Sequence, residues 1–351
     1  MSRVYEGATC AVPITSNDRI TLAHGDGGRA MRKLIRERVV SKFENAKDYP
    51  SGDAADLGVM PDRMAVTTDS YVVSPLFFPG GDIGSLAVHG TVNDLAMAGA
   101  TPLYLTLALI IEEGFPLADF DRIISSVAKS AMECGVKVVT GDTKVVPKGA
   151  ADGIFINTTG FGTLQHPHVD GAKHLAPNDC LIFSGPIGQH GIAVLAARES
   201  LKFTPAPQTD SAPLHHVTLA LRRELNAHLH AMRDATRGGV AAVLHEWAEE
   251  SGQAMWLDEA KIPLTPATQG ICETLGLDPL FLANEGTFVT AVAEHRCADA
   301  INLLRRFPVS QHAAMVGRVI PRGVSPVVVH RGIGVDQPLD ESLHAMLPRI
   351  C

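Results

Sequence analysis

Apolar residues recur along this chain with two different spacings. Apolar positions three or four residues apart predict helices, at residues 30–43, 82–99, 119–134, 188–199, 213–227 and 239–252. Short apolar or alternating runs predict strands, at residues 64–68, 104–111, 136–140, 154–161, 180–184, 287–293, 313–319 and 327–330. Because strands and helices alternate along most of the sequence, we expect a mixed fold of the α/β class, of its α+β type.

The apolar periodicity lapses between residues 164 and 178, where His, Pro and Gly cluster. We therefore place a domain boundary there, with an N-terminal domain over residues 1–165 and a C-terminal α/β domain over residues 166–335. A chain of 351 residues has the length of about two domains. The stretch after the last predicted strand holds Gly, Pro and mixed charge. We expect residues 336–351 to form a mobile tail.

Composition and charge exclude several classes of protein. Hydrophobic residues make up 46% of the chain, enough for folded cores and too many for a disordered protein. The net charge of -8 argues against general binding to nucleic acid or to anionic membranes. The most apolar stretch, Leu103 to Ile111, is too short to span a bilayer, and no signal peptide is visible. We expect a cytoplasmic protein.

The six cysteines are sparse, and no two form a CxxC pair. This spacing excludes a zinc ribbon, a thioredoxin-type motif and a disulfide scaffold, and favours a reducing compartment. The sequence ends in Cys351, about 20 residues beyond the last predicted strand, a length that reaches ~60 Å when extended. A thiol at that position could carry a chemical group between sites. The alternative is that Cys351 is an incidental residue, and the residues alone favour this alternative.

Three aspartates stand out by their positions. Asp69 and Asp142 end predicted strands, and Asp94 lies on a predicted helix after Asn93. Carboxylates at strand ends are well placed to gather around Mg²⁺, which prefers hard oxygen ligands and brings phosphate with it. The alternative is that they form turns or cap helices, as most such aspartates do.

Two glycine-rich turns lead into predicted helices. They are Gly25-Asp26-Gly27-Gly28, which follows His24, and Gly80-Gly81. Glycine lets backbone N–H groups approach a phosphate, and a helix N-terminus adds positive potential. Neither turn matches a P-loop or a Rossmann fingerprint, so each remains open to the simpler interpretation of a tight turn.

Three further charged residues could take part in catalysis. Lys144 follows Asp142 by two positions and could neutralise phosphate or transfer a proton, or be a surface charge. Asp234, between Arg233 and Arg237, could belong to an anion site or pair with an arginine. Glu285, in Asn-Glu-Gly, is either a turn residue or an active-site base.

Together these motifs resemble the HypE family of hydrogenase maturation factors. The resemblance covers about residues 20–351, and the ending Pro-Arg-Ile-Cys is its most diagnostic part, since the glycine motifs also occur in aminoimidazole ribonucleotide synthetase and selenophosphate synthetase. The matching segments are Thr68-Asp69-Ser70, Pro75-Leu76-Phe77-Phe78-Pro79-Gly80-Gly81, Asn93-Asp94, Val139 to Val146, Asp234-Ala235-Thr236-Arg237-Gly238-Gly239, Asn284-Glu285-Gly286 and Pro348-Arg349-Ile350-Cys351.

The resemblance implies an ATP-dependent carbamoyl dehydratase. A carbamoyltransferase, HypF, would load the Cys351 thiol, and ATP would activate the carbamoyl oxygen so that elimination leaves a thiocyanate. Its cyanide would pass to iron on a HypC–HypD scaffold for the [NiFe]-hydrogenase site. The implied residue roles are Mg²⁺ ligation by Asp69, Asp94 and Asp142, ATP contacts from His24, Gly25, Gly27, Gly28, Thr140 and Asp234, and proton transfer by Glu285 or Lys144.

The resemblance also implies a two-domain aminoimidazole ribonucleotide synthetase-like fold. The N-terminal domains of two chains would pair into a β-barrel, giving a homodimer with ATP sites near the interface. Two alternatives stay open. Another ATP-dependent enzyme of this superfamily would keep the Asp and Gly motifs without needing Cys351, and a scaffold protein would need the tail for docking only.

Overall fold

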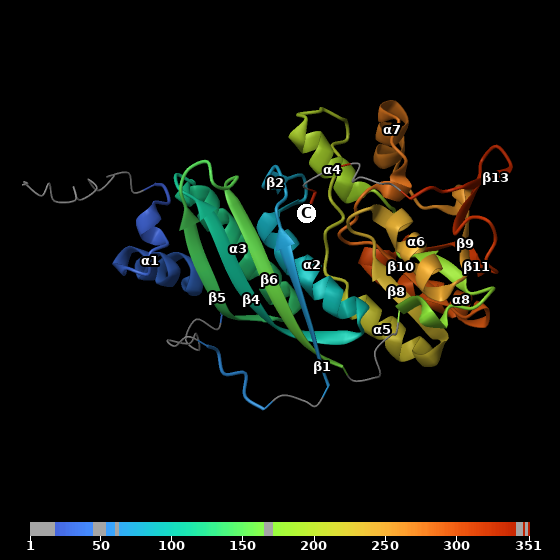
Figure 1. Ribbon diagram of the computed structural model, residues 1–351, viewed down its shortest axis with the longest axis horizontal. Helices are drawn as coiled ribbons and strands as arrows, with labels where there is room; N and C mark the ends of the chain where they lie inside the picture. The colour runs from blue at the N-terminus through green and yellow to red at the C-terminus, as the bar shows by residue number, and fades with distance from the viewer. Residues whose placement is uncertain (1–17, 45–53, 60–62, 165–170, 342–346, 348–349) are drawn as a thin grey trace, which may run out of the picture.

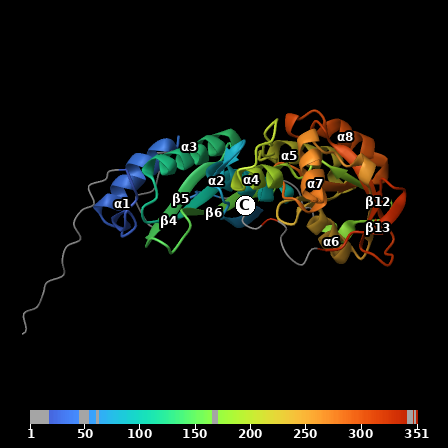
Figure 2. The ribbon, with the colours of Figure 1, turned by 90° about the horizontal axis from the view of Figure 1, so that it is seen from above.

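The computed structural model describes residues 18–44, 54–59, 63–164, 171–341, 347 and 350–351. Two large β-sheets form separate layers, one within residues 64–164 and one within residues 180–338. The sheets stand side by side in Figure 1, and the end of the chain lies between them there and in the view from above in Figure 2. Pro348 and Arg349 of the family-type ending, like residues 1–17, fall outside the described residues.

The first sheet has four strands in the order β1-β6-β4-β5. Strands β4 and β5 are parallel, and the other two pairs are antiparallel. Helix α1 and its 3₁₀ and π-helical extensions lie beside the β5 edge (Figure 1). The elements are a 3₁₀ turn (Leu22–His24), α1 (Arg29–Leu34), a π-helical segment (Ile35–Val39), a 3₁₀ turn (Val40–Lys42), β1 (Met64–Tyr71), β2 (Phe77–Phe78), β3 (Gly81–Asp82), α2 (Ile83–Met97), β4 (Ala100–Glu112), α3 (Leu117–Cys134), β5 (Lys137–Val146) and β6 (Ile154–Leu164).

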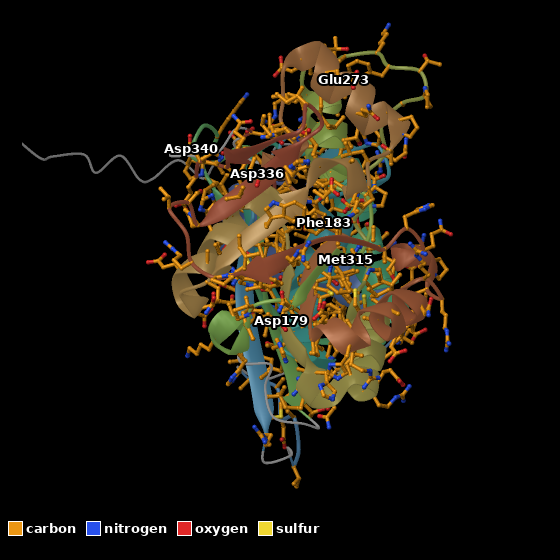
Figure 3. The ribbon with its side chains drawn as sticks, turned by 90° about the vertical axis from the view of Figure 1, so that its right-hand side faces the viewer. Asp179, Phe183, Glu273, Met315, Asp336 and Asp340 are labelled. Atoms are coloured by element: carbon orange, nitrogen blue, oxygen red, sulfur yellow. The ribbon has the colours of Figure 1, made fainter. Side chains whose placement is uncertain are left out.

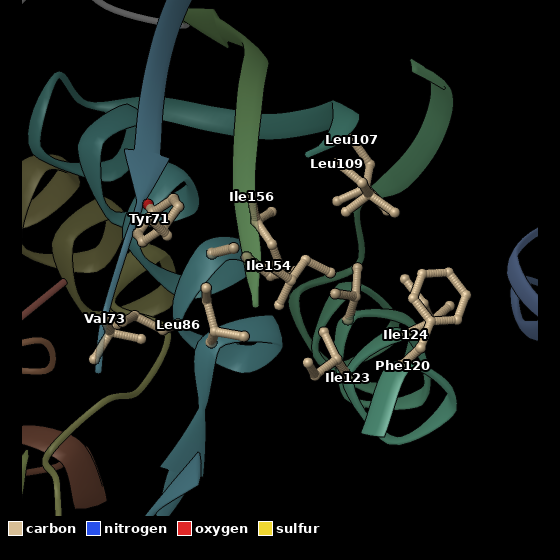
Figure 4. Close-up of a cluster of buried hydrophobic side chains, with 14 of the residues drawn as sticks. Tyr71, Val73, Leu86, Leu107, Leu109, Phe120, Ile123, Ile124, Ile154 and Ile156 are labelled. Carbon is tan, nitrogen blue, oxygen red and sulfur yellow. The ribbon is translucent and has the colours of Figure 1, made fainter. Parts of the chain in front are cut away.

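Helices α2 and α3 cover one face of this sheet. Inward-facing residues of β4 and β6 form one apolar cluster with α3, to which Leu107, Ile156 and Phe120 belong (Figure 4). Each such buried side chain stabilises the fold by roughly 1.5–3 kcal/mol. The other face, turned to the viewer in Figure 1, carries exposed side chains such as Val66 and Thr68. One buried and one solvated face explain the alternating pattern of β1 and β6.

The second sheet has seven strands in the order β13-β12-β9-β11-β7-β10-β8. Helix α6 packs on one face, and α5 and α8 pack on the other. Phe183 and Met315, near the middle of Figure 3, belong to apolar clusters on these opposite faces. The elements are β7 (Cys180–Phe183), α4 (Gln189–Arg198), α5 (His215–Leu225), β8 (Leu229–Asp234), α6 (Gly239–Ser251), β9 (Ala254–Asp258), α7 (Pro266–Leu275), β10 (Phe288–Val292), α8 (Cys297–Leu304), β11 (Ala314–Ile320), β12 (Val327–Arg331) and β13 (Val335–Pro338).

Helix α2 joins the two halves. Asp82 caps its start by accepting hydrogen bonds from the Gly84 and Ser85 N–H groups. The helix packs against the first sheet and α3 on one side and against α5 of the second half on the other, so every residue except Ser85 and Asp94 is buried. Burial all round, rather than on one stripe, marks α2 as a central helix.

The structure corrects several boundaries expected from the sequence. Asp69 and Asp142 lie inside β1 and β5, not after them, because both strands continue with residues that alternate between the two faces of the sheet. The first residues of the expected tail are part of the fold, since β13 pairs with β12 and Leu339 is buried. Strands β8 and β9 and helices α7 and α8 were not expected, although Thr265, Pro266 and Gly276 bound α7 with ordinary start and stop signals.

None of the helices in the described part of the chain is long and apolar enough to cross a membrane.

Candidate functional site

Four acidic side chains meet where β1, α2, β8 and the loop before β10 converge. Asp69 comes from β1, Asp94 from α2, Asp234 from the end of β8 and Glu285 from the loop. Asp234 and Glu285 are 7% and 3% exposed, whereas Asp69 and Asp94 are partly exposed. We call these four residues and Cys351 the junction site, because both halves of the molecule contribute to it.

Burial and repulsion from neighbouring carboxylates raise the pKa values of three of them, Asp94, Asp234 and Glu285. The pKa of Asp94 is raised by burial and by Asp69, although a hydrogen bond from Thr67 at 2.8 Å opposes the shift. Burial and the Asp94 charge raise the pKa of Asp234 to about 7. The pKa of Glu285 is raised well above its ordinary value by burial and by Asp234, and its Oε1 atom has no hydrogen-bond partner among the residues that the structure describes.

Two buried asparagines hold the loops around Glu285. Asn93 of α2 donates from Nδ2 to the main-chain oxygens of Glu285 and Ala212, at 3.2 and 3.1 Å. Asn284 accepts from the Gly188 N–H group at 2.6 Å and donates to the Ala235 oxygen at 2.9 Å. These amides satisfy buried main-chain groups from several loops, so they fix where the Glu285 carboxyl lies.

The end of the chain docks into this junction. Cys351 accepts a hydrogen bond at its main-chain oxygen from the Val72 N–H group, at 3.2 Å. Burial and then the Glu285 charge raise the pKa of the Cys351 thiol, while Arg237 opposes the shift. Arg237 is exposed and also lies 3.9 Å from Asp69. The docked Cys351 is therefore a neutral thiol beside a buried carboxyl group of its own chain.

The remaining predicted site residues gather elsewhere, along β5 and the turn before α1. Lys144 and Asp142 are exposed and form an ion pair with each other at 2.9 Å. Gly25 packs on Val145 of β5, where an added Cβ would lie 2.4 Å from the Val145 nitrogen. We call this set the β5 group; its members are His24, Gly25, Gly27, Gly28, Thr140, Asp142 and Lys144.

A single chain keeps the two sets apart. β1 and β5 are the outer strands of the four-stranded sheet, so three strand spacings, about 14 Å in all, separate Asp69 from Asp142. Two ligands of one Mg²⁺ lie within about 4 Å of each other. Among the residues that the structure describes, no three His, Cys, Asp or Glu side chains are close enough to hold a metal ion. Asp142 thus does not join Asp69 and Asp94 within one chain.

His24 has a local structural role. Its Nδ1 atom accepts a hydrogen bond from the Thr21 N–H group at 3.0 Å, which closes the 3₁₀ turn. Gly27 has a φ of +81°, a conformation that favours glycine, and Gly28 donates to Asp26 at 2.8 Å before α1 begins. The turn is therefore built by its own contacts, and it lies next to the β5 edge.

Several residues of the junction were not identified as functional from the sequence. Asn93 and Asn284 lie in the quoted motifs, so their place in those motifs was a usable signal. Asp210 accepts from the Glu285 and Gly286 N–H groups at 3.0 and 3.1 Å, and His190 contacts the tail. Neither of these two belongs to a motif, and only the tertiary structure shows their role.

Comparison with known proteins defines the class first. The N-terminal domain model of AIR synthase related proteins matches residues 52–164, and the C-terminal domain model of the same proteins matches residues 176–330. The fold, with its two sheets and central α2, is thus that of an AIR synthase related protein.

Within that class, the chain belongs to the HypE family. It is 45% identical over 334 residues to the carbamoyl dehydratase HypE of Cupriavidus necator, and this match covers 95% of each chain. A crystal structure of hydrogenase maturation protein HypE in complex with ATP superposes with a TM-score of 0.89 at 41% identity, covering 94% of this chain and 99% of that one. A crystal structure of a HypE–HypF complex gives a TM-score of 0.77 at 41% identity, covering 90% of this chain and 100% of that one.

Proposed function

We propose that this chain dehydrates a carbamoyl group carried on the Cys351 sulfur. The carbamoyl oxygen attacks the γ-phosphorus of ATP, the bond to the β-phosphate oxygen breaks, and ADP leaves. The nitrogen then loses both protons while the carbon–oxygen bond breaks and phosphate departs. The products are a thiocyanate on Cys351, ADP and phosphate. Phosphorylation is needed because an amide oxygen is a poor leaving group.

One observation carries this proposal: Cys351 docks at the junction, close enough to Glu285 for that carboxylate to raise the thiol pKa, and Glu285 Oε1 has no hydrogen-bond partner among the described residues. A group that removes protons from the carbamoyl nitrogen must lie within reach of it. Burial and the neighbouring carboxylates raise the pKa of Glu285, which makes its carboxylate a stronger base than that of an exposed glutamate. Lys144, the other candidate base, is paired with Asp142 at the opposite edge of the first sheet.

The docked thiol is poorly suited to the earlier loading step. The thiolate is the nucleophilic form of cysteine, and burial and Glu285 raise the pKa of docked Cys351. Loading by a carbamoyltransferase therefore requires the tail to leave the junction. In solvent, the thiol regains its ordinary pKa. Dehydration requires the tail to return. We propose that Cys351 moves between these two positions.

The donor chemistry of the junction fits Mg²⁺. Asp69, Asp94 and Asp234 offer hard oxygen ligands, and their mutual repulsion would be relieved by a divalent cation. When bound, Mg²⁺ would neutralise charge on the phosphates of ATP. Because no three of these side chains are close enough to hold a metal ion by themselves in the described residues, we propose that one or two of them share the cation with the phosphates of ATP. We further propose that Gly25, Gly27 and Gly28 lie over phosphate, with His24, Thr140 and Asp142 near the nucleotide.

The separation between the junction site and the β5 group favours an assembly of two chains. We propose that the open face and edges of the first sheet pair with those of a second chain, forming the expected barrel and homodimer with ATP near the interface. The polar and apolar side chains on that face are left uncovered by the described residues of one chain. HypF would load Cys351, and the HypC–HypD scaffold would accept the cyanide.

Intact mass spectrometry tests the proposal in two stages. The purified chain is first incubated with HypF, carbamoyl phosphate and ATP, then separated from them and given ATP with magnesium. We expect addition of one carbamoyl group, followed by an ATP-dependent loss of one water, both mapped to Cys351. Cys351→Ala is the control and should stay unmodified. Equal modification of that variant would overturn the carrier role and favour one of the two alternative functions.

A further inference from the structure

The docked end of the chain contacts both halves of the molecule. The Ile350 side chain is buried in the apolar cluster of the first half, and its main-chain oxygen lies 2.8 Å from His190 Nε2. The Val72 N–H group holds the next residue, as described above. His190 belongs to α4 of the second half and Val72 to the first, so the tail is held from both sides.

The protonation state of His190 follows from its partners. A carbonyl oxygen only accepts hydrogen bonds, so Nε2 carries the proton and donates to Ile350. Burial lowers the pKa of His190, so the ring is neutral and Nδ1 is an acceptor. The Thr209 hydroxyl lies 2.8 Å from Nδ1 and donates to it, and it accepts in turn from the Ser211 N–H group at 3.0 Å. A T-shaped contact with Phe78 fixes the ring orientation.

The same short segment also positions the candidate base. Between Thr209 and Ser211, Asp210 accepts from the Glu285 and Gly286 N–H groups. Gly286 has room for hydrogen only, because an added Cβ would lie 1.8 Å from the Asp210 main-chain oxygen. Residues 209–211 therefore contact the tail through His190 and the Glu285 loop through Asp210.

We infer that His190 and Thr209 form a latch that holds the tail in its docked position and so sets how often Cys351 faces Glu285. This inference rests on the proposed carrier function of Cys351. His190 is a positioning residue, since it touches the main chain of the tail and not the reacting group. Loading needs the tail released and dehydration needs it docked, so latch strength shifts the balance between the two steps.

Thiol accessibility tests the latch without any dehydration assay. The unloaded full-length protein is alkylated with iodoacetamide at fixed pH, and modification of Cys351 is followed by peptide mass spectrometry. His190→Leu removes the donor, and Thr209→Val removes the hydroxyl but keeps the shape. Losing one hydrogen bond should speed alkylation of Cys351 about 3- to 10-fold in each variant. His190→Gln, whose amide nitrogen can donate to Ile350, should stay nearer to the unmodified chain.

His330→Leu is the matched control, because His330 is an exposed histidine of the same half that pairs with Asp336. It should leave the alkylation rate of Cys351 unchanged. If Thr209→Val and His190→Leu both alkylate at the control rate, the latch does not exist. Should His190→Leu fail to fold, Thr209→Val decides the question alone, since it replaces a hydroxyl by a methyl group of equal size.

A second readout separates the latch from the proposed function. Where the docked form predominates, the same loss of one hydrogen bond should speed carbamoyl loading about 3- to 10-fold, as it speeds alkylation. Dehydration of pre-loaded protein at saturating ATP should then fall by less than about twofold, with the KM for ATP unchanged. A purely structural defect would instead slow both steps or raise that KM, and would overturn the positioning role. Faster alkylation with no dehydration in any variant, the unmodified chain included, would retain the latch and refute the dehydratase.

Discussion

The junction site and the β5 group differ in how their charges are neutralised. In the β5 group, Asp142 and Lys144 neutralise each other at 2.9 Å with both side chains more than half exposed. At the junction, burial raises the pKa values of Asp94, Asp234 and Glu285. The opposing positive charges are Arg233, which acts on Asp94 and Asp234, and the exposed Arg237, which acts on Asp94. A surface pair of the first kind contributes little energy, whereas buried like charges are costly.

This difference assigns different chemistry to the two regions. Carboxyl groups with raised pKa values suit proton transfer and the binding of a cation. An exposed ion pair on an outer strand suits contact with a mobile ligand or with a second chain. The docked Cys351 lies at the first region and not at the second, and for this reason we propose that the bond-breaking step takes place there.

The comparison of the junction site with the β5 group predicts that the largest loss of dehydration rate follows from replacing Glu285, the candidate base. Glu285→Gln keeps the shape of the side chain but removes its ability to accept a proton. The rate of dehydration of pre-loaded protein should fall about 10²- to 10⁴-fold, the range of general-base catalysis, with carbamoyl loading unchanged. Single-turnover mass spectrometry measures both steps.

Lys144→Met, a variant in the β5 group, is compared with Glu285→Gln in the same dehydration assay. Because Lys144 is exposed and distant from docked Cys351 within one chain, we expect at most a tenfold loss. Equal losses in the two variants would show that the two regions act as one site, as they could in a dimer.

The second prediction concerns pH and stability. The folded pKa of Asp234 is raised to about 7 from 3.8, so its contribution to stability is full below about pH 4 and is lost as pH rises through 7. Asp234→Asn cannot titrate. Relative to the variant, the unmodified chain should therefore lose up to about 1.4 kcal/mol of unfolding free energy per pH unit across this window.

Urea unfolding at pH 5 and pH 7.5 measures this difference. Asp142→Asn is the matched control from the β5 group, and the same change there should leave the pH dependence of unfolding as it is in the unmodified chain. If Asp234→Asn shows the same pH dependence as the unmodified chain, the Asp234 carboxyl is not held under strain by its neighbours.

Much of the fold was accessible from the sequence, because local signals dominate there. Helix α3 and its end at Gly135, whose φ is +68°, follow from apolar spacing and a glycine stop. Central strands such as β4 are continuous apolar runs. The missed strand β8 is an outer strand with polar residues on one side, and such strands carry a weaker signal.

The candidate site could be predicted from the sequence only in part, because the motifs do not show which residues lie close together in space. Asp69 and Asp142 have similar sequence surroundings, yet the strand order β1-β6-β4-β5 places them on opposite outer strands. Cys351 stands out because of the Pro-Arg-Ile-Cys ending, but the sequence does not show which residues surround it. Glu285 and His190, which contacts Ile350, come near the tail only through tertiary packing. The sequence predicts candidate reacting groups, and the structure sorts these candidates into two regions.

The smallest effect is expected for the stability of Lys144→Met. Exposed ion pairs contribute about 0–1 kcal/mol, so losing the contact with Asp142 should change the free energy of unfolding by less than about 0.5 kcal/mol. Urea unfolding at low and high salt measures this, and salt should erase the difference, because exposed charges are screened. A loss of several kcal/mol that depends on protein concentration would mean that Lys144 is buried against a second chain, and it would place the β5 group inside the dimer interface.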